Sequence, residues 1–192
     1  MRAGFVDPVF ESQRVFRGVL AAMSEPGRVI RLEAPPVAPG PLHPATVAIA
    51  LALVDLETPI WLDDAAATAE TVAHLRFHCG CPIVDEPARA RFAVIADPDR
   101  MPEIGAFDAG TDEYPDRSAT LIVQTRDLIA GSGRRLSGPG IATEARLSAQ
   151  ALPPRFWEAM RANHARFPRG IDVLLTAGVS LVALPRTTWV EG

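Results

Sequence analysis

Short apolar segments of strand length alternate along this chain with segments of helical period, and that alternation restricts the fold more than any single motif does. The strand-like segments are RVIRL (28–32), PIWL (59–62), CPIV (81–84), RFAVIA (91–96), ATLIVQ (119–124), IDVLLTAG (171–178) and SLVALP (180–185). Strands that alternate with helices predict an α/β fold with a mixed sheet whose ends are antiparallel. Because no internal repeat or linker interrupts the 192 residues, we expect a single α/β domain over residues 1–192.

Two helices are expected in the N-terminal third. Asp7 and Pro8 have the residue types preferred at an N-cap and a first helical position, and a Pro-Gly pair ends the segment. One face of this helix is expected to carry the apolar residues Val15, Phe16, Val19, Leu20 and Met23. The second helix, residues 45–56 (ATVAIALALVDL), is almost wholly apolar, so it has to be covered on most sides by the core or by an interface.

A third helix is expected in the middle of the chain. Asp63 or Asp64 is predicted to cap it, and it runs to about His78, with Gly80 in the left-handed conformation that often follows a helix. A short helix is also predicted around residues 101–107.

The C-terminal half adds a hairpin and a fourth helix. The glycine-rich segment GSGRR (131–135) predicts a turn, with LSGPGI (136–141) as the second arm of the hairpin. Residues 153–167 begin on prolines and read as a helix. Its expected apolar surface consists of Phe156, Trp157, Met160 and Phe167.

Every basic residue of the chain is arginine, and lysine is absent. This composition excludes a Walker lysine, a Schiff-base lysine and a lysine general base. The net charge is -4, and the 19 arginines are scattered rather than gathered in one stripe. Nucleic acid is therefore not expected as a partner.

The first ten residues lack the apolar core of a signal peptide, because Asp7 and Pro8 fall where that core should run. The longest uncharged stretch, residues 34–54, is proline-rich at its start, and its remaining apolar part is too short to span a bilayer. We therefore expect a cytoplasmic protein without a membrane partner.

Residues 75–84 (LRFHCGCPIV) contain both cysteines of the chain, Cys79 and Cys81, next to His78. Zinc needs about four ligands, usually from two separated pairs, and no second pair exists, so no metal site is expected. A C-x-C dithiol could cycle between thiols and a disulfide, but a helix C-terminus disfavours a thiolate. The favoured interpretation is that both cysteines pack where a helix turns into a strand. For His78, capping of the helix C-terminus is favoured over a role as general base.

The segment GSGRRLSGPG (131–140) is the best candidate for phosphate binding. Its glycines expose backbone N–H groups, and Arg134 and Arg135 can form bidentate contacts with phosphate oxygens. Because neither a helix nor a lysine follows, the segment is not a P-loop. A hairpin turn with two solvated arginines is the favoured interpretation, and a ligand contact is the alternative.

The loop GTDEYPDRS (110–118) brings together Asp112, Glu113 and Asp116, which could suggest a divalent cation. The spacing does not match an EF-hand, and a Pro-Asp pair is ordinary turn chemistry, so a solvated loop is expected. No serine lies in a G-x-S-x-G context. The residues alone therefore predict no catalytic residue.

Several segments together resemble the PhnH family, the H subunit of the bacterial carbon-phosphorus lyase system. They are QRVFRGVLAAMSEPGR (13–28), TPIWL (58–62), LRFHCGCPIV (75–84), ATLIVQ (119–124), LSGPGI (136–141), FPRGIDVLLTAG (167–178) and LVALPRTTWVE (181–191). The resemblance runs from Asp7 to Glu191. The helix ending in AMSEPG and the late pair GIDVLLT and LPRTT are its most specific part, because their order and spacing agree as well as their letters.

The resemblance implies an accessory, non-catalytic subunit. With its partner subunits G, I and J, the family supports transfer of a ribose triphosphate unit from ATP to an alkylphosphonate, before a radical subunit cleaves the carbon-phosphorus bond. Apolar surfaces, the helix at residues 45–56 among them, are expected to bind a second copy or another subunit. The alternative is an independent small enzyme, or a nucleotide- or phosphonate-binding protein, that uses Arg134, Arg135 and His78.

The resemblance also implies a fold similar to the large domain of pyridoxal-phosphate-dependent transferases, a three-layer α/β homodimer, here without the cofactor. The absence of lysine agrees, because such enzymes hold their aldehyde as a lysine Schiff base. Phe77, His78 and Pro82 match the family motif, whereas Cys79 stands where the family has threonine. The resemblance therefore gives the cysteines no role.

Overall fold

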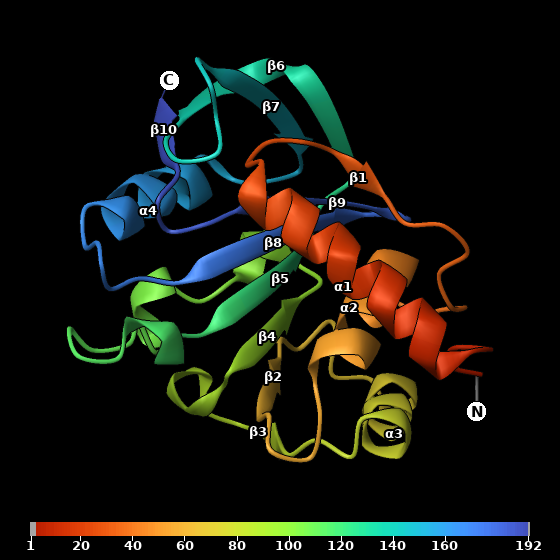
Figure 1. Ribbon diagram of the computed structural model, residues 1–192. Helices are drawn as coiled ribbons and strands as arrows, with labels where there is room; N and C mark the ends of the chain where they lie inside the picture. The colour runs from red at the N-terminus through yellow and green to blue at the C-terminus, as the bar shows by residue number, and fades with distance from the viewer. Residues whose placement is uncertain (1–2, 192) are drawn as a thin grey trace.

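A seven-stranded mixed sheet forms the centre of the computed structural model, which describes residues 3–191 (Figure 1). The strand order is β1-β9-β8-β5-β4-β2-β3. The strands are β1 (Ile30–Arg31), β2 (Ile60–Leu62), β3 (Ile83–Val84), β4 (Phe92–Ile95), β5 (Thr120–Gln124), β8 (Asp172–Ala177) and β9 (Ser180–Leu184). The five strands from β8 to β3 are parallel, and β9 and β1 are antiparallel to their neighbours. The predicted mixed sheet is confirmed, but only one of its ends is antiparallel, because β3 pairs in parallel with β2.

The central strands bury side chains on both faces of this sheet. Val94, Ile122 and Leu174 belong to the apolar cluster on one face. Their neighbours in sequence, such as Leu121 and Val173, belong to the cluster on the other face. This double burial explains why the strands read as continuous apolar runs instead of alternating polar and apolar residues.

Helices α1 (Pro8–Ser24), α2 (Pro44–Leu53) and α3 (Ala69–His78) cover one face of the sheet (Figure 1). The other face is covered by α4 (Pro154–His164) and by a small antiparallel sheet with the order β10-β6-β7. Its strands are β6 (Asp127–Ser137), β7 (Ala145–Gln150) and β10 (Trp189–Glu191). Single 3-10 turns lie at Pro87–Arg89, Pro98–Arg100, Ile104–Ala106 and Pro115–Arg117. The chain is thus α/β, with the large sheet between two outer layers.

Helix α1 begins and ends as predicted, but its buried face is narrower. The Asp7 carboxylate accepts a hydrogen bond from the Phe10 N–H, and Pro8 is the first helical residue. The buried positions are Val15, Val19 and Ala22. The prediction was wrong for Phe16 and Leu20, whose side chains are exposed. The helix packs on the rest of the protein through its buried face only, and these two residues lie on the outer side of the helix.

Helix α2 ends at Leu53, three residues earlier than predicted, and lies inside the helical layer. Residues 45–50 are all buried, in one cluster with residues of α1, α3 and the sheet. Its apolar composition is therefore satisfied within the chain, which corrects the expectation that this helix forms an interface with another protein. Across residues 3–191 no helix is both long and apolar enough to cross a bilayer.

The N-cap of α3 is Thr68, whose hydroxyl accepts a hydrogen bond from the Thr71 N–H, and not Asp63 or Asp64. Asp63 is used elsewhere: its buried carboxylate accepts hydrogen bonds from the N–H groups of Ala66 (2.7 Å), Ala96 (2.9 Å) and Asp97 (2.8 Å). It links the chain after β2 to the chain after β4. The prediction for Gly80 is confirmed, since its φ is +65° at the end of α3.

The predicted turn at residues 131–135 is wrong, because this segment lies within β6. Ala130 and Arg134 both pair with Leu147 of β7, so residues 131–133 form a bulge. Gly131 and Gly133 both have a φ of +81°. Positive φ suits a bulge as well as a turn, and the sequence does not distinguish the two. The hairpin connection falls instead between Ser137 and Ala145.

The fourth predicted helix is confirmed as α4, where Phe156, Trp157 and Met160 are buried. Phe167 lies beyond the end of this helix and is exposed, so it does not contribute to the apolar face. The helix predicted at residues 101–107 is reduced to one 3-10 turn at Ile104–Ala106. Strand β10 was not predicted.

A cluster of hydrogen bonds connects the start of α2 to the carboxyl ends of β5 and β8. The Thr46 hydroxyl donates to Gln124 Oε1 (3.0 Å) and lies 2.8 Å from the Thr176 hydroxyl. Gln124 Oε1 also accepts from the His43 N–H (2.6 Å), and His43 Nδ1 lies 3.2 Å from the Thr176 carbonyl oxygen. Burial lowers the pKa of His43, and the hydrogen bond to the Thr176 carbonyl opposes this only in part.

Replacing Asp63 should destabilise the fold strongly, because Asp63→Ala leaves three backbone N–H groups without their acceptor. We expect the free energy of unfolding to fall by at least about 3 kcal/mol in urea denaturation. The matched control is Asp64→Ala, whose side chain is 89% exposed and, among residues 3–191, paired only with the exposed Arg100. That variant should stay within about 0.5 kcal/mol of the wild type. Equal stability of the two variants would contradict the role given to Asp63.

The pKa of His43 predicts a pH dependence of stability. The unfolded chain takes up a proton at His43 near pH 6.5, whereas the folded chain does so only at lower pH. Stability from this residue is therefore complete above about pH 7.5 and is lost as the pH falls below 6.5. His43→Gln removes the titration, so the difference in unfolding free energy between wild type and variant should shift against the wild type between pH 8 and pH 5. A difference that stays constant over this range would exclude the effect.

Candidate functional site

A pocket of about 540 Å³ lies between the small sheet and α4, and it contains both arginines selected from the sequence. Its lining includes Arg134, Arg135, Arg146, Trp157 and Glu191. These residues come from β6, β7, α4 and β10, so the site exists only when the small sheet has formed on the large one. This pocket is the candidate site that best matches the sequence analysis.

The pairing of the three small-sheet strands sets the charges of this pocket. Arg135 is the direct cross-strand neighbour of Arg146 on β7 and of Glu191 on β10. Two like charges opposite each other destabilise a sheet. Here carboxylates compensate: Arg135 Nε donates to Glu191 (2.7 Å), and Glu144 lies 3.6 Å from Arg135 and 3.3 Å from Arg146. Arg135 and Arg146 are thus held in place by their own ion pairs.

Arg134 differs from these two arginines. It directly follows the bulge, is half-buried, and its side chain has no ion pair or hydrogen bond with the other residues of the 3–191 range. A guanidinium group presents several N–H donors in a plane that matches phosphate and phosphonate oxygens. The pocket therefore offers one free cation beside two compensated ones, which suits an oxyanion.

The structure places His78 far from these arginines in the fold. His78 is the last residue of α3, in the helical layer, whereas β6 lies in the layer on the other side of the large sheet. The His78 ring lies 4.4 Å from the ring of His74 and 4.9 Å from that of Phe77 (centroid distances). The N-terminal segment at Gly4 packs against it. His78 and the arginines therefore do not form one site.

Cys79 and Cys81 are both buried and unoxidised, directly after α3. The hydrogen bond between the two thiols is the main cause that raises the pKa of Cys79, and burial raises it further. The same hydrogen bond is the main cause that lowers the pKa of Cys81, although burial opposes this. The Cys79 thiol also lies 3.8 Å from the Ala50 carbonyl oxygen of α2. Both residues belong to the apolar cluster of the helical layer. Within residues 3–191 no group of three or more histidine, cysteine or carboxylate side chains is close enough to hold a metal ion.

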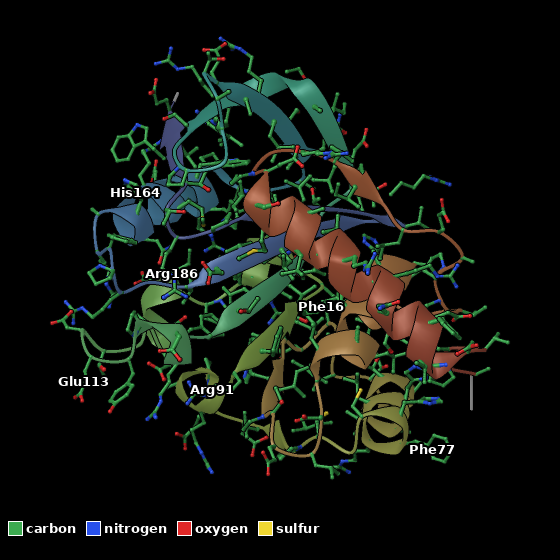
Figure 2. All side chains as sticks on the ribbon, viewed as in Figure 1. Phe16, Phe77, Arg91, Glu113, His164 and Arg186 are labelled. Atoms are coloured by element: carbon green, nitrogen blue, oxygen red, sulfur yellow. The ribbon has the colours of Figure 1, made fainter. Side chains whose placement is uncertain are left out.

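The acidic loop is a solvated surface, as expected. Asp112, Glu113 and Asp116 are exposed, and Figure 2 shows Glu113 at the edge of the molecule. Asp112 forms an exposed ion pair with Arg169 (3.2 Å).

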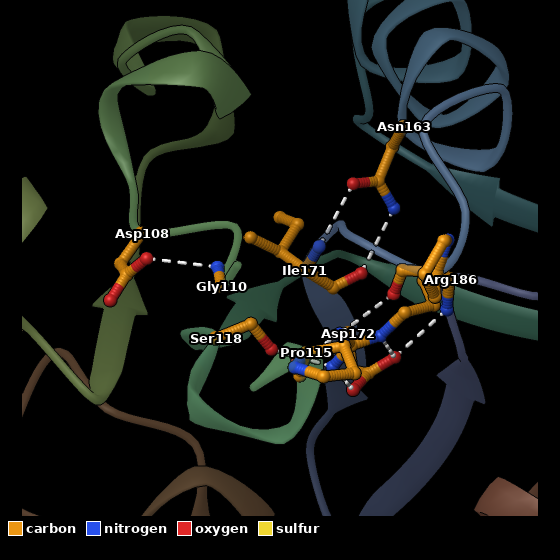
Figure 3. A network of polar contacts seen from close by, with 9 residues as sticks. Asp108, Gly110, Pro115, Ser118, Asn163, Ile171, Asp172 and Arg186 are labelled. Atoms are coloured by element: carbon orange, nitrogen blue, oxygen red, sulfur yellow. Dashed lines mark hydrogen bonds and ion pairs between the residues drawn. The ribbon is translucent and has the colours of Figure 1, made fainter. Parts of the chain in front are cut away.

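The sequence analysis missed a half-buried ion pair between Asp172 and Arg186 (Figure 3). Arg186 Nη2 lies 2.6 Å from Asp172 Oδ2, and Nε lies 3.2 Å from Oδ1, a two-point contact. The same guanidinium donates to the Ser118 hydroxyl (2.5 Å) and to the Pro115 carbonyl oxygen (2.5 Å). The signal was present, since Asp172 lies in GIDVLLT and Arg186 in LPRTT, but a sequence gives no pairing between two separate segments.

Other segments that carry the family resemblance also meet one another. A Cβ on Gly140 would lie 2.1 Å from the Ser24 carbonyl oxygen, so LSGPGI lies against AMSEPG. A Cβ on Gly138 would lie 2.6 Å from the Thr187 carbonyl oxygen, so the same segment also lies against LPRTT. These motifs thus join the end of α1, the hairpin and the C-terminal segment.

The carboxyl edge of the parallel strands is the usual place for ligands in an α/β sheet, at the point where the strand order reverses. Here the reversal lies at β2, which has β3 on one side and β4 on the other. The Asp63 carboxylate already occupies the backbone N–H groups at this point. A pocket of about 220 Å³ further along this edge is lined by His43, Gln124 and Arg126, among others, and is small for a cofactor.

Known proteins similar to this chain agree on one family. A family model described as "Bacterial phosphonate metabolism protein (PhnH)" matches residues 3–191. A relative from Rhizobium meliloti (strain 1021), the alpha-D-ribose 1-methylphosphonate 5-triphosphate synthase subunit PhnH, is 40% identical over 187 residues, which cover 97% of this chain and 94% of the relative.

A second relative, from Stutzerimonas stutzeri, is 32% identical over 185 residues, which cover 93% of this chain and 85% of the relative. Its name proposes it as a C-P lyase subunit protein, HtxG. Both matches extend over nearly the whole chain. This chain therefore belongs to the PhnH family of bacterial phosphonate metabolism proteins.

Proposed function

We propose that this chain is an accessory subunit of the carbon-phosphorus lyase system, which supports, with its partner subunits, the ATP-dependent formation of a ribose 1-alkylphosphonate 5-triphosphate during phosphonate catabolism. The observation that carries the proposal is the similarity to two named subunits over 93% or more of this chain. A relationship of this extent covers the whole fold and not a shared module.

A non-catalytic role fits the chemistry of the family motifs. The motif residues Asp172 and Arg186 are engaged with each other and with Ser118, and the two cysteines are buried. These groups stabilise the packing of separate segments, and none of them is placed as an activated nucleophile or general base. Support of a reaction by such a subunit would come from binding and positioning its partners.

The finer features of the proposal follow from the family. We expect the partners to be subunits G, I and J, the isolated chain to form a homodimer, and the location to be the cytoplasm. We also expect one domain over residues 1–192, with a fold similar to the large domain of pyridoxal-phosphate-dependent transferases. The lysine-free composition supports a version of that fold without the cofactor.

The subunit role is tested by co-expression. The affinity-tagged chain is produced with subunits G, I and J of the same bacterium, captured in mild salt and analysed by size-exclusion chromatography. We expect all four chains to elute together at a mass above that of the isolated protein. If the tagged chain elutes without the other subunits, the proposed function is wrong.

A second candidate function is binding of a phosphorylated or phosphonylated ligand, and the pocket at Arg134 favours it. The pocket has about 540 Å³, within the roughly 300–1,000 Å³ usual for small-molecule sites. Arg134 supplies a cation that has no ion pair or side-chain hydrogen bond within residues 3–191, and the largely buried Trp157 completes the lining. This function would apply to the isolated chain and does not require partner subunits.

Titration calorimetry with ATP and with methylphosphonate tests this second function. If the pocket is a ligand site, the isolated chain should bind one of them with a Kd in the micromolar range, about -8 kcal/mol. Replacing Arg134 and Arg135 by alanine should abolish the heat signal. Arg117→Ala is the control, because Arg117 packs on the Tyr114 ring (4.1 Å) outside the pocket and should leave binding unchanged. Absence of binding to the wild type would exclude the second function.

A further inference from the structure

Helix α1 carries an apolar stripe on its outer side, interrupted once by the polar Gln13. The stripe consists of Val6, just before the helix, and Val9, Phe16 and Leu20, which are 93%, 75%, 46% and 51% exposed. With Gln13 in the series, the spacing is three, four, three and four residues. This is the heptad spacing of a helix that packs against another helix. Figure 2 labels Phe16 on α1.

The core does not require this stripe. α1 packs on α2, β1 and β9 through its other side, where Val15, Val19 and Ala22 are buried. With Phe10 beside it, the stripe exposes an apolar area on the order of 500 Å², near the upper limit for a monomeric protein. It would supply more than half of the roughly 800 Å² that one partner buries in a stable interface.

Charge along one border of the stripe indicates the kind of partner. Phe10, Arg14 and Arg17 are neighbours on this side of the helix. Arg31 lies across a groove of about 210 Å³ between α1 and β1, which Glu33 also lines. In the range 3–191 none of these three arginines forms an ion pair or a side-chain hydrogen bond. Some other surface arginines, such as Arg28 and Arg135, are paired with carboxylates.

We propose that the stripe on α1 binds an amphipathic helix of a partner subunit, whose apolar face is bordered by aspartate or glutamate on the side that meets Arg14 and Arg17. The inference rests on the proposed function, since it needs a partner subunit. A second copy of the chain fits less well, because a two-fold antiparallel pairing of α1 would place the same arginine border against itself. Nor does the first turn of α1 supply a free carboxylate for such a pairing, because its one carboxylate, Glu11, already accepts hydrogen bonds from the Val6 and Asp7 N–H groups.

The test uses the co-expressed complex with subunits G, I and J and two kinds of variant. Phe16→Ser with Leu20→Ser removes the C-terminal half of the stripe, and Arg14→Glu with Arg17→Glu reverses the charge of the border. Each pair should reduce the yield of captured partner subunits by about tenfold or more. The matched control replaces Phe167 and Ile129 by serine, since both are exposed but lie in the layer of α4 and the small sheet. This control should capture the partners as the wild type does.

Because all replaced side chains are exposed, the variants should melt within a few degrees of the wild type, which circular dichroism verifies. If the wild type itself captures no partner, the proposed function fails. If the wild type and both variants capture equal amounts, the subunit role stands and the inference about α1 is wrong. Variants that keep the partners but lose the homodimer, measured by light scattering, would also overturn the inference, because a second copy would then cover the stripe.

Discussion

Burial of β4, β5 and β8 on both faces is the constraint on which the rest of this structure depends. Each of these strands contributes alternate side chains to two separate apolar clusters. A sheet of this kind is stable only if both faces are covered. The helical layer and the layer of α4 with the small sheet therefore have to form together with the large sheet. These two layers in turn determine where the pocket and α1 lie.

The strands and helices were largely predictable, because each is determined by residues close together in sequence. Continuous apolar runs indicate buried strands, and the Asp-Pro start of α1 indicates a helix. The errors concern properties set by distant contacts. Asp63 looks like an N-cap in sequence, yet its oxygens bind N–H groups of the chain after β4. Phe16 looks like a core residue, and only the direction in which α1 packs shows that it is exposed.

The candidate site, too, was predictable only where its residues are close together in sequence. Arg134 and Arg135 were identifiable as possible anion ligands from the adjoining glycines, but Arg146 and Trp157 reach the pocket only through strand pairing and the packing of α4. The pairing of Asp172 with Arg186 was equally hidden. The segments that carry the family resemblance pack against one another, so they specify the internal packing of this chain. Binding of other molecules depends on the outer surfaces.

The Asp63 carboxylate has a wider consequence. Three N–H groups converge on it at the point where related sheet architectures hold the anionic part of a ligand. The protein thus carries an assembled anion site that is filled by its own side chain.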